Sequence, residues 1–407
     1  MAEKKENTTG AGMTRRNFLK SLGIGGLAAG AAPVLAASQA LGAEAPKTMP
    51  MRTLGKTGVK VPVLALGGMF DTINNQLLLK QALSWGVTYW DTSEVYGNGL
   101  SEEGFGRFFS RNPDRRKDVF LVTKHPPRGG NHTERLEKSL ARLNTNYVDL
   151  FFVHSTSAAS DVTPELLAWG EQMKKAGKIK YFGYSTHTNV EDCLLGTAKN
   201  PGGIDVIMHS YNIHLMLKPK MQEAVAACAK AGIGLVAMKT QGAGPGGMVS
   251  EAEAKMADRF LKRGFTDKQA KLKAVWETPE MASVCSQMPS LTILAANVAA
   301  AKDQVALDKA EMRSLREYAS ACQGYCAGCG SICQQAVGGA VAVNEVMRAL
   351  MYHKEYGEPE LARQTFASLP ERSRAVLAGL DYSRAEAACP QKLEIAALMR
   401  EAGELLA

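Results

Sequence analysis

Residues 119–154 read VFLVTKHPPRGGNHTERLEKSLARLNTNYVDLFFVH and contain one complete strand–helix–strand unit. The runs Val119–Lys124 and Val148–His154 are mostly apolar, as strands buried on both faces are. Between them, Thr133–Leu143 has the residue pattern of a helix. Two doubly buried strands that are joined through a helix predict a parallel sheet.

The same alternation continues on both sides of this unit. Further strands are predicted at Val63–Gly67, Thr88–Asp91, Tyr181–Ser185, Val206–Ser210, Gly234–Lys239 and Ser283–Met288. Helical patterns lie among them at Gln76–Trp85, Pro164–Ala176 and Lys220–Ala231. Eight strand–helix units, each roughly 30 residues long, predict an α/β fold, a closed (β/α)8 TIM barrel. An open doubly wound sheet is the alternative, but no G-x-G-x-x-G motif follows the first strand.

The sequence divides into three predicted regions: a signal peptide at residues 1–45, the barrel at 46–317, and a small, mainly helical, cysteine-containing extension at 318–407. Residues 14–20 read TRRNFLK and precede a short apolar stretch rich in Ala and Gly. This segment resembles a twin-arginine signal. The resemblance implies passage through the twin-arginine export machinery to a periplasmic or other extracytoplasmic location. A disordered basic tail is the alternative.

The formal net charge of the chain is +8. Residues 1–45 hold five basic and three acidic side chains, so +2 of that charge belongs to the predicted signal and +6 to the rest. No cluster of Lys and Arg with interleaved aromatic residues follows the signal. The charge therefore predicts a mildly basic, solvated surface and no nucleic-acid partner.

Four polar residues stand at or just beyond the ends of consecutive predicted strands: Asp91, Tyr96, Lys124 and His154. Taken singly, each has a structural explanation, such as a turn cap, a solvated strand end or a core histidine. In a parallel barrel, however, the carboxyl ends of the strands converge on one mouth, where catalytic groups are found. The four together therefore predict an active site.

Several stretches around these residues resemble the aldo-keto reductase superfamily across residues 52–310. They are WDTSEVYGNG from Trp90, LVTKH from Leu121, SLARLNTNYVDLFFVH from Ser139 and YFGYST from Tyr181. The resemblance implies an oxidoreductase that interconverts a small carbonyl compound and an alcohol by hydride transfer with NAD(P). It also implies that the four strand-end residues are the family's catalytic tetrad, with Tyr96 as general acid/base.

The chemistry of the tetrad follows from its residue types. A free tyrosine has a pKa of about 10, so we expect the Lys124 ammonium to lower the pKa of Tyr96. Asp91 would hold Lys124, and His154 would hydrogen-bond the substrate carbonyl. The resemblance places the cofactor on Ser185, Met238, Lys239 and Asn297.

The predicted cofactor site departs from the family pattern. Met208 and Met238 align where the family has a glutamine and a stacking tyrosine. No Lys or Arg occurs between Lys273 and Lys302 to bind the 2′-phosphate of NADP. The choice between NAD and NADP, or neither, is therefore open. An exported electron-transfer or partner-binding barrel with an eroded cofactor site is the alternative function.

Four of the eight cysteines form a C-x3-C-x2-C-x3-C motif. They are Cys322, Cys326, Cys329 and Cys333, and Cys389 follows at a distance. Four thiolates within such a short segment can ligate one iron–sulfur cluster. Disulfides in an oxidising compartment and a zinc site are the alternatives.

This segment also resembles the ferredoxin-like C-terminal extension of a subset of aldo-keto reductases. The resemblance implies one 4Fe-4S cluster with either Cys389 or Cys333 as the fourth ligand. Because free nicotinamide cofactor is expected to be scarce outside the cytoplasm, a redox partner could supply electrons through the cluster. The substrate cannot be read from the sequence, since barrel-mouth loops set specificity.

Overall fold

The computed structural model describes residues 48–242, 264–303, 305–321 and 325–407. Within it, residues 49–407 form one compact unit. The predicted signal peptide and Cys322 lie outside the described residues. In the described part of the chain, no helix is both long and apolar enough to cross a membrane.

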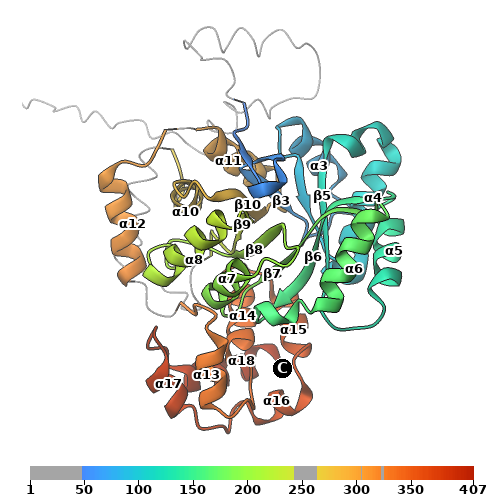
Figure 1. The fold of residues 1–407 in the computed structure, drawn as a ribbon. Helices are drawn as coiled ribbons and strands as arrows, with labels where there is room; N and C mark the ends of the chain where they lie inside the picture. The colour runs from blue at the N-terminus through green and yellow to red at the C-terminus, as the bar shows by residue number, and fades with distance from the viewer. Residues whose placement is uncertain (1–47, 243–263, 304, 322–324) are drawn as a thin grey trace, which may run out of the picture. The chain divides into compact units, whose positions relative to one another are not determined.

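Eight parallel strands close into a barrel, in the order β10-β3-β4-β5-β6-β7-β8-β9, which confirms the predicted (β/α)8 fold (Figure 1). The strands are β3 (Leu64–Gly67), β4 (Tyr89–Asp91), β5 (Phe120–His125), β6 (Val148–Thr156), β7 (Ile179–Thr186), β8 (Val206–Ser210), β9 (Gly234–Met238) and β10 (Met281–Gln287). A two-stranded antiparallel ribbon, β1 (Met51–Thr53) with β2 (Lys60–Pro62), precedes them. All eight predicted strands are present.

Helices surround the barrel. They are α3 (Gln76–Ser84), α4 (Leu100–Arg111), α5 (His132–Arg142), α6 (Pro164–Lys175), α7 (Val190–Lys199), α8 (Pro219–Lys230), α10 (Asp267–Trp276) and α11 (Leu291–Lys302). Short 3-10 turns are η1 (Gly55–Thr57), η2 (Tyr96–Gly99), η3 (Pro113–Asp118) and η4 (Ala159–Asp161). The start of α6 has the expected chemistry, because the Thr163 side chain accepts a hydrogen bond from the Leu166 amide and Pro164 occupies the first helical position.

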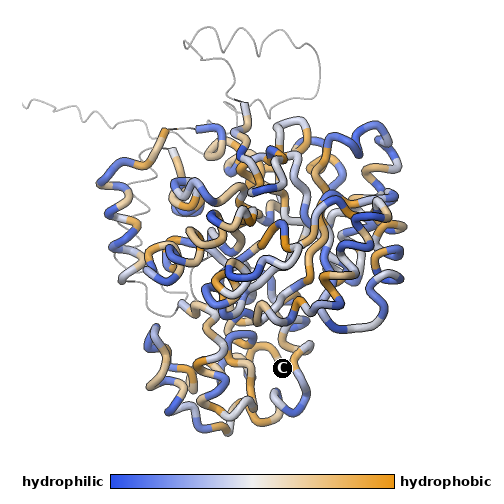
Figure 2. The backbone as a smooth tube through the Cα atoms, in the orientation of Figure 1, coloured by the Kyte–Doolittle hydropathy of each residue, from blue (hydrophilic) through white to orange (hydrophobic). Residues whose placement is uncertain are grey.

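The strands are buried on both faces, which explains their continuous apolar sequences. Successive residues of a strand point to opposite sides. In β6, Phe151 belongs to the large core between strands and helices, whereas Phe152 belongs to a separate core with residues of the other strands, such as Val122 of β5 and Val236 of β9. Figure 2 shows the apolar residues concentrated along the strands and the polar ones on the outer helices.

The C-terminal extension is mainly helical, as predicted. It contains α12 (Lys309–Ala321), α13 (Gly330–Ala336), α14 (Val343–Lys354), α15 (Pro359–Ala367), α16 (Glu371–Val376), α17 (Ser383–Ala388) and α18 (Ile395–Leu406). Helices α13 to α18 gather at one end of the barrel (Figure 1). They have a core of their own, which includes Leu350, Phe366 and Met399 and packs against Met69, just after β3.

Candidate active site

The centre of the site is a buried ion pair between neighbouring strands. Asp91 ends β4 and Lys124 lies on β5, and the Lys124 Nζ donates to Asp91 Oδ1 at 2.6 Å and to the Thr92 carbonyl at 2.7 Å. Both side chains are almost fully buried. Burial, the largest single effect, disfavours the ammonium, but Asp91 foremost, with Tyr96 and Cys285, together raise the pKa of Lys124 above its usual value. Lys124 is therefore a permanently charged group.

Tyr96 is brought to this pair by a tight turn. It begins η2, and the next residues, Gly97 and Asn98, have positive φ angles of 58° and 53°. The turn places the Tyr96 hydroxyl 3.4 Å from Lys124 Nζ, which donates to it. The predicted direction of its pKa shift is wrong. Burial raises the pKa of Tyr96 above its usual value, and the nearby Lys124 ammonium lowers it by less.

His154 completes the tetrad in space. Its ring meets the Tyr96 ring edge-on, with 5.7 Å between centroids. The Ser93 hydroxyl donates to the Lys124 carbonyl and lies 3.2 Å from His154 Nδ1. Because that hydroxyl proton is already engaged, Nδ1 is assigned as the protonated nitrogen and Nε2 as an acceptor. Burial, followed by the charge of Lys124, lowers the pKa of His154 well below its usual value, so the ring is neutral.

Three of the four predicted cofactor residues lie at the ends of β7 and β9, two strands that are separated by β8. Ser185 lies near the end of β7, and its hydroxyl oxygen accepts a hydrogen bond from the Ser155 amide at 3.1 Å. Met238 ends β9 and is buried. Lys239 follows in a left-handed conformation with φ of 57°. Its Nζ donates to the hydroxyl of Tyr352, on α14.

Asn297 lies apart from these three, on α11. Its amide nitrogen donates to the Ser286 hydroxyl at 3.1 Å, and its amide oxygen accepts from Gln241 at 3.2 Å and from Gln269 at 3.4 Å. This network joins the end of β10 to α10 and α11. The polar groups needed to bind a neutral adenine are thus present, though they are engaged with one another. The functions predicted for Asn297 and the other cofactor residues stay predictions.

Four of the five predicted cysteine ligands line one small cavity. Cys326 and Cys329 precede α13, Cys333 lies within it, and Cys389 follows α17. None of these four forms a disulfide. Burial raises the pKa of Cys326 to about 12, and the neighbouring cysteines add to that effect. Among the described residues, no three Cys, His, Asp or Glu side chains are close enough together to hold a metal ion.

The cysteine segment is attached directly to the barrel. Gly328 has a φ of 76°, and a Cβ there would lie 2.3 Å from the carbonyl oxygen of His187, just after β7. The Gly328 carbonyl accepts a hydrogen bond from the Asn189 amide at 2.9 Å. Only glycine permits both this backbone conformation and this approach. The cysteines are therefore held against the same barrel end as the tetrad.

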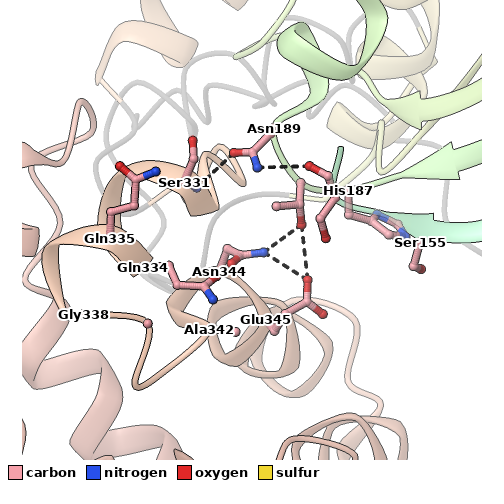
Figure 3. A pocket seen from close by; sticks show the side chains of 13 residues that line it. Ser155, His187, Asn189, Ser331, Gln334, Gln335, Gly338, Ala342, Asn344 and Glu345 are labelled. Carbon is pink, nitrogen blue, oxygen red and sulfur yellow. Dashed lines mark hydrogen bonds between the residues drawn. The ribbon is translucent and has the colours of Figure 1, made fainter. Parts of the chain in front are cut away.

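Helix α14 covers that end of the barrel. Besides the Lys239–Tyr352 contact, the Asn344 amide donates to Thr188 Oγ1 at 2.8 Å, and Thr188 Oγ1 donates to Glu345 at 3.3 Å. Thr188 of the barrel and Asn344 and Glu345 of α14 line a cleft with a volume of about 710 Å³. Figure 3 shows Asn344 and Glu345 in this cleft. The contact between Tyr352 and Lys239 was missed from the sequence, because contacts made across more than 100 residues leave no local pattern.

Three comparisons identify similar proteins. The sequence profile described as "Aldo/keto reductase family" matches residues 66–318. An aldo-keto reductase of Schizosaccharomyces pombe, named for NADP(+), is 33% identical over 159 residues, which are 34% of this chain and 46% of that protein. A probable voltage-gated potassium channel subunit beta of Arabidopsis thaliana is 32% identical over 154 residues, again 34% of this chain and 46% of that one.

The chain spans about half the length of the curated relatives it matches. Among solved structures, an aldo-keto reductase of Bacillus halodurans in its holo form superposes with a TM-score of 0.53 at 24% identity. That match covers 66% of this chain and 96% of the other. At this level of identity the likeness concerns the fold alone.

Proposed function

This chain belongs to the aldo/keto reductase family, and from that premise we propose that it is a nicotinamide-dependent oxidoreductase that interconverts a carbonyl and an alcohol. The observation that carries the proposal is the buried Lys124–Asp91 pair in contact with the Tyr96 hydroxyl, beside a neutral His154. This arrangement stands at the carboxyl ends of barrel strands, where enzymes of this fold carry out catalysis.

Tyr96 is the proton donor in this proposal. Its raised pKa keeps the hydroxyl protonated at neutral pH, and the oxygen of a carbonyl that receives a hydride becomes more basic than a phenolate. Tyr96 can therefore give its proton to that oxygen, and the Lys124 ammonium at 3.4 Å stabilises the phenolate that remains. Because its Nε2 carries no proton, His154 cannot donate to the substrate carbonyl as expected from the sequence, but it can accept a hydrogen bond from the new alcohol. The raised pKa favours reduction over oxidation at neutral pH.

The cofactor in this proposal is a nicotinamide dinucleotide, which supplies the hydride when bound. Ser185 offers its hydroxyl to the carboxamide, and Asn297 with Gln241 offers amide groups to the adenine. No basic residue lies between Lys273 and Lys302, and Lys273 itself is paired with Asp303 at 3.0 Å. The chain's residues thus fit NAD better than NADP, whose 2′-phosphate would lack a cation.

The test is the oxidation of NADH and NADPH by the purified full chain with a panel of aldehydes and ketones. The Tyr96→Phe variant removes the proton donor and should lower kcat by about 10²- to 10⁴-fold. Its fold should be intact, because the lost hydroxyl makes one long hydrogen bond. Undiminished turnover by this variant would contradict the proposed mechanism.

A second candidate function is an electron-transfer or partner-binding barrel. It is favoured by the covered mouth, where Tyr352 of the extension binds Lys239 at 2.9 Å, and by the absence of a stacking tyrosine at Met238. A matched relative is named as a potassium channel subunit. Binding of neither NADH nor NADPH to the purified chain, measured by calorimetry, would favour this candidate.

We also propose that the extension holds one iron–sulfur cluster. The support is a cavity with mostly apolar walls that is lined by four cysteines without disulfides. Cysteine thiolates are the usual ligands of iron–sulfur clusters. Cys322, Cys326 and Cys329 would serve as ligands, with Cys389 or Cys333 as the fourth. A bound cluster would supply one-electron transfer, and a redox partner would then exchange electrons with the extension.

The location proposed for the protein is outside the cytoplasm, after export by the twin-arginine machinery. The support is the sequence TRRNFLK at residues 14–20, followed by a short apolar stretch. Twin-arginine export carries folded chains and so suits a protein that receives its cofactors before it leaves the cytoplasm. Fractionation of the source cells tests this, and recovery of the chain in the cytoplasm alone would contradict it.

A further inference from the structure

A second cavity lies where α14 meets the barrel mouth, and two cations line it. Its walls include His187, Ser210 and Lys239 from the barrel, and Asn344, Glu345 and Arg348 from α14. The barrel residues follow or end three successive strands, β7, β8 and β9. The cavity therefore lies between the extension and the ends of β7, β8 and β9, at the same end of the barrel as the tetrad, whose residues lie on or just after β4, β5 and β6.

The guanidinium of Arg348 uses only some of its hydrogen-bond donors in this position. Its guanidinium Nη2 is paired with Glu345, while its Nε is buried and has no hydrogen-bond partner. The side chain is 21% exposed. A buried N–H without an acceptor is costly. Glu345, by contrast, also accepts hydrogen bonds from Asn344 and Thr188. The unused donor thus belongs to the arginine, and an acceptor at this place would satisfy it.

Lys239 adds a positive charge to this cavity. Within the described residues it forms no salt bridge, and its ammonium donates to the Tyr352 hydroxyl at 2.9 Å and lies 4.4 Å from the centre of that ring. Burial raises the pKa of Tyr352, but Lys239 and Arg348 together lower it below its usual value. The other two cations of the mouth have partners, since Lys124 is paired with Asp91 and Arg348 with Glu345. Among these three cations of the described residues, Lys239 is therefore the one without an acidic partner.

The histidines nearby add no further positive charge. Burial is the main cause that lowers the pKa of His187 and of His154 well below the usual value, and the charges of Arg348 and Lys239 add to it in both cases. Both rings are neutral at physiological pH. Because Arg348 and Lys239 both lower the pKa of His154, both cations act electrostatically on that ring. Burial lowers the pKa of Arg348, but Glu345 first, and then Tyr352 and Tyr96 in their ionised forms, together raise it above its usual value. The cation pair lies within electrostatic range of the catalytic groups.

We propose that the substrate is a carbonyl compound that bears a carboxylate, bound by Lys239 and Arg348 in this cavity. The inference rests on the proposed function and names the class of its substrate. One negative charge balances the charge of Lys239, the cation without an acidic partner, whereas a phosphate ester brings about 1.5 to 2 negative charges. The planar guanidinium, with a free Nε–H, suits a carboxylate geometrically. Tyr96 would then protonate the carbonyl oxygen of a substrate anchored by its acid group.

The test compares matched acids and esters as substrates of the full chain. Two pairs with different spacing between carbonyl and acid are pyruvate with methyl pyruvate, and 4-carboxybenzaldehyde with its methyl ester. At least one acid should have a lower KM than its ester. The Arg348→Leu variant should raise the KM for that acid by about 10- to 100-fold, the range for loss of a charge-assisted hydrogen bond. The KM for the ester should change by less than about twofold.

The control variant is Arg363→Leu, which removes an arginine of the same extension that is 49% exposed and paired with Glu360. It should leave both KM values unchanged. Equal KM values for acid and ester in both pairs, or equal effects of Arg348→Leu on them, would overturn the inference while leaving the proposed function standing. A rise in the KM for NADH with either substrate would also overturn it, because the cations would then serve the cofactor diphosphate. No turnover of any carbonyl compound, ester included, would instead count against the proposed function.

Discussion

At the scale of single residues, the polar chemistry of the mouth depends on burial. Which residues meet could be predicted: Asp91 and Lys124 lie at the carboxyl ends of adjacent strands and form an ion pair. The direction of the pKa shift of Tyr96 could not be predicted, because the sequence offers the charged partner Lys124 but does not show the loss of water around the hydroxyl. In the structure, the loss of water dominates.

The buried pair gives a stability prediction. Lys124→Met leaves the Asp91 carboxylate buried without its partner, and this should lower the free energy of unfolding by about 3 to 5 kcal/mol. The double variant with Asp91→Asn removes both charges and should recover most of that loss. Urea denaturation measures the stabilities. Neither variant should have activity, because both lack the ammonium beside Tyr96. Wild-type stability of Lys124→Met would mean that the pair is not a buried ion pair.

At the scale of elements, the strands could be predicted almost residue by residue, and the position of the extension could not. The predicted strand at Val206–Ser210 agrees with β8 at both ends, because a doubly buried strand is apolar throughout. In contrast, Lys239 and Tyr352 are 113 residues apart in the chain. Neither the charge nor the ring has a local pattern that indicates the other.

The cysteine cavity between α13 and α17 gives a prediction at this scale. If Cys389 is a ligand and Cys333 is spare, Cys389→Ser should lower the bound iron of anaerobically purified protein to a small fraction, while Cys333→Ser leaves about four iron per chain. The reverse result, in which Cys333→Ser loses the iron and Cys389→Ser keeps it, would assign Cys333 as the fourth ligand and leave Cys389 spare. Cys228→Ser, at a buried cysteine of α8, is the matched control. No iron or sulfide in the wild-type chain would remove the cluster from the proposal.

At the scale of the whole molecule, the histidines make stability depend on pH. Burial, the largest cause in each case, lowers the pKa of His209 and of His214 to about 4 and the pKa of His125 to about 3. The unfolded chain binds these protons near pH 6.5, and the folded one does not. Stability is therefore complete above pH 6.5 and falls as the pH decreases towards about 4.

His209→Asn tests this prediction. His209 is fully buried, and its Nδ1 lies 3.1 Å from the Ser210 carbonyl, a contact that the asparagine amide can reproduce. Between pH 8 and pH 5, the variant should lose about 2 kcal/mol less of its free energy of unfolding than the wild type. Urea denaturation at the two pH values gives this difference, and the comparison at pH 8 alone reports any change in packing. An identical pH dependence of the two proteins would rule out His209 as a source of the effect.

The cover that α14 places over the barrel also has a consequence for the order of synthesis. The last barrel strand ends at Gln287, whereas Arg348 and Tyr352 follow more than 60 residues later. A ribosome therefore completes every strand of the barrel before it adds the helix that closes the mouth. During that interval the strand ends are still uncovered, and a cofactor that enters a barrel formed early does not have to displace α14. For a ligand that arrives after translation is complete, the same helix is the barrier to entry.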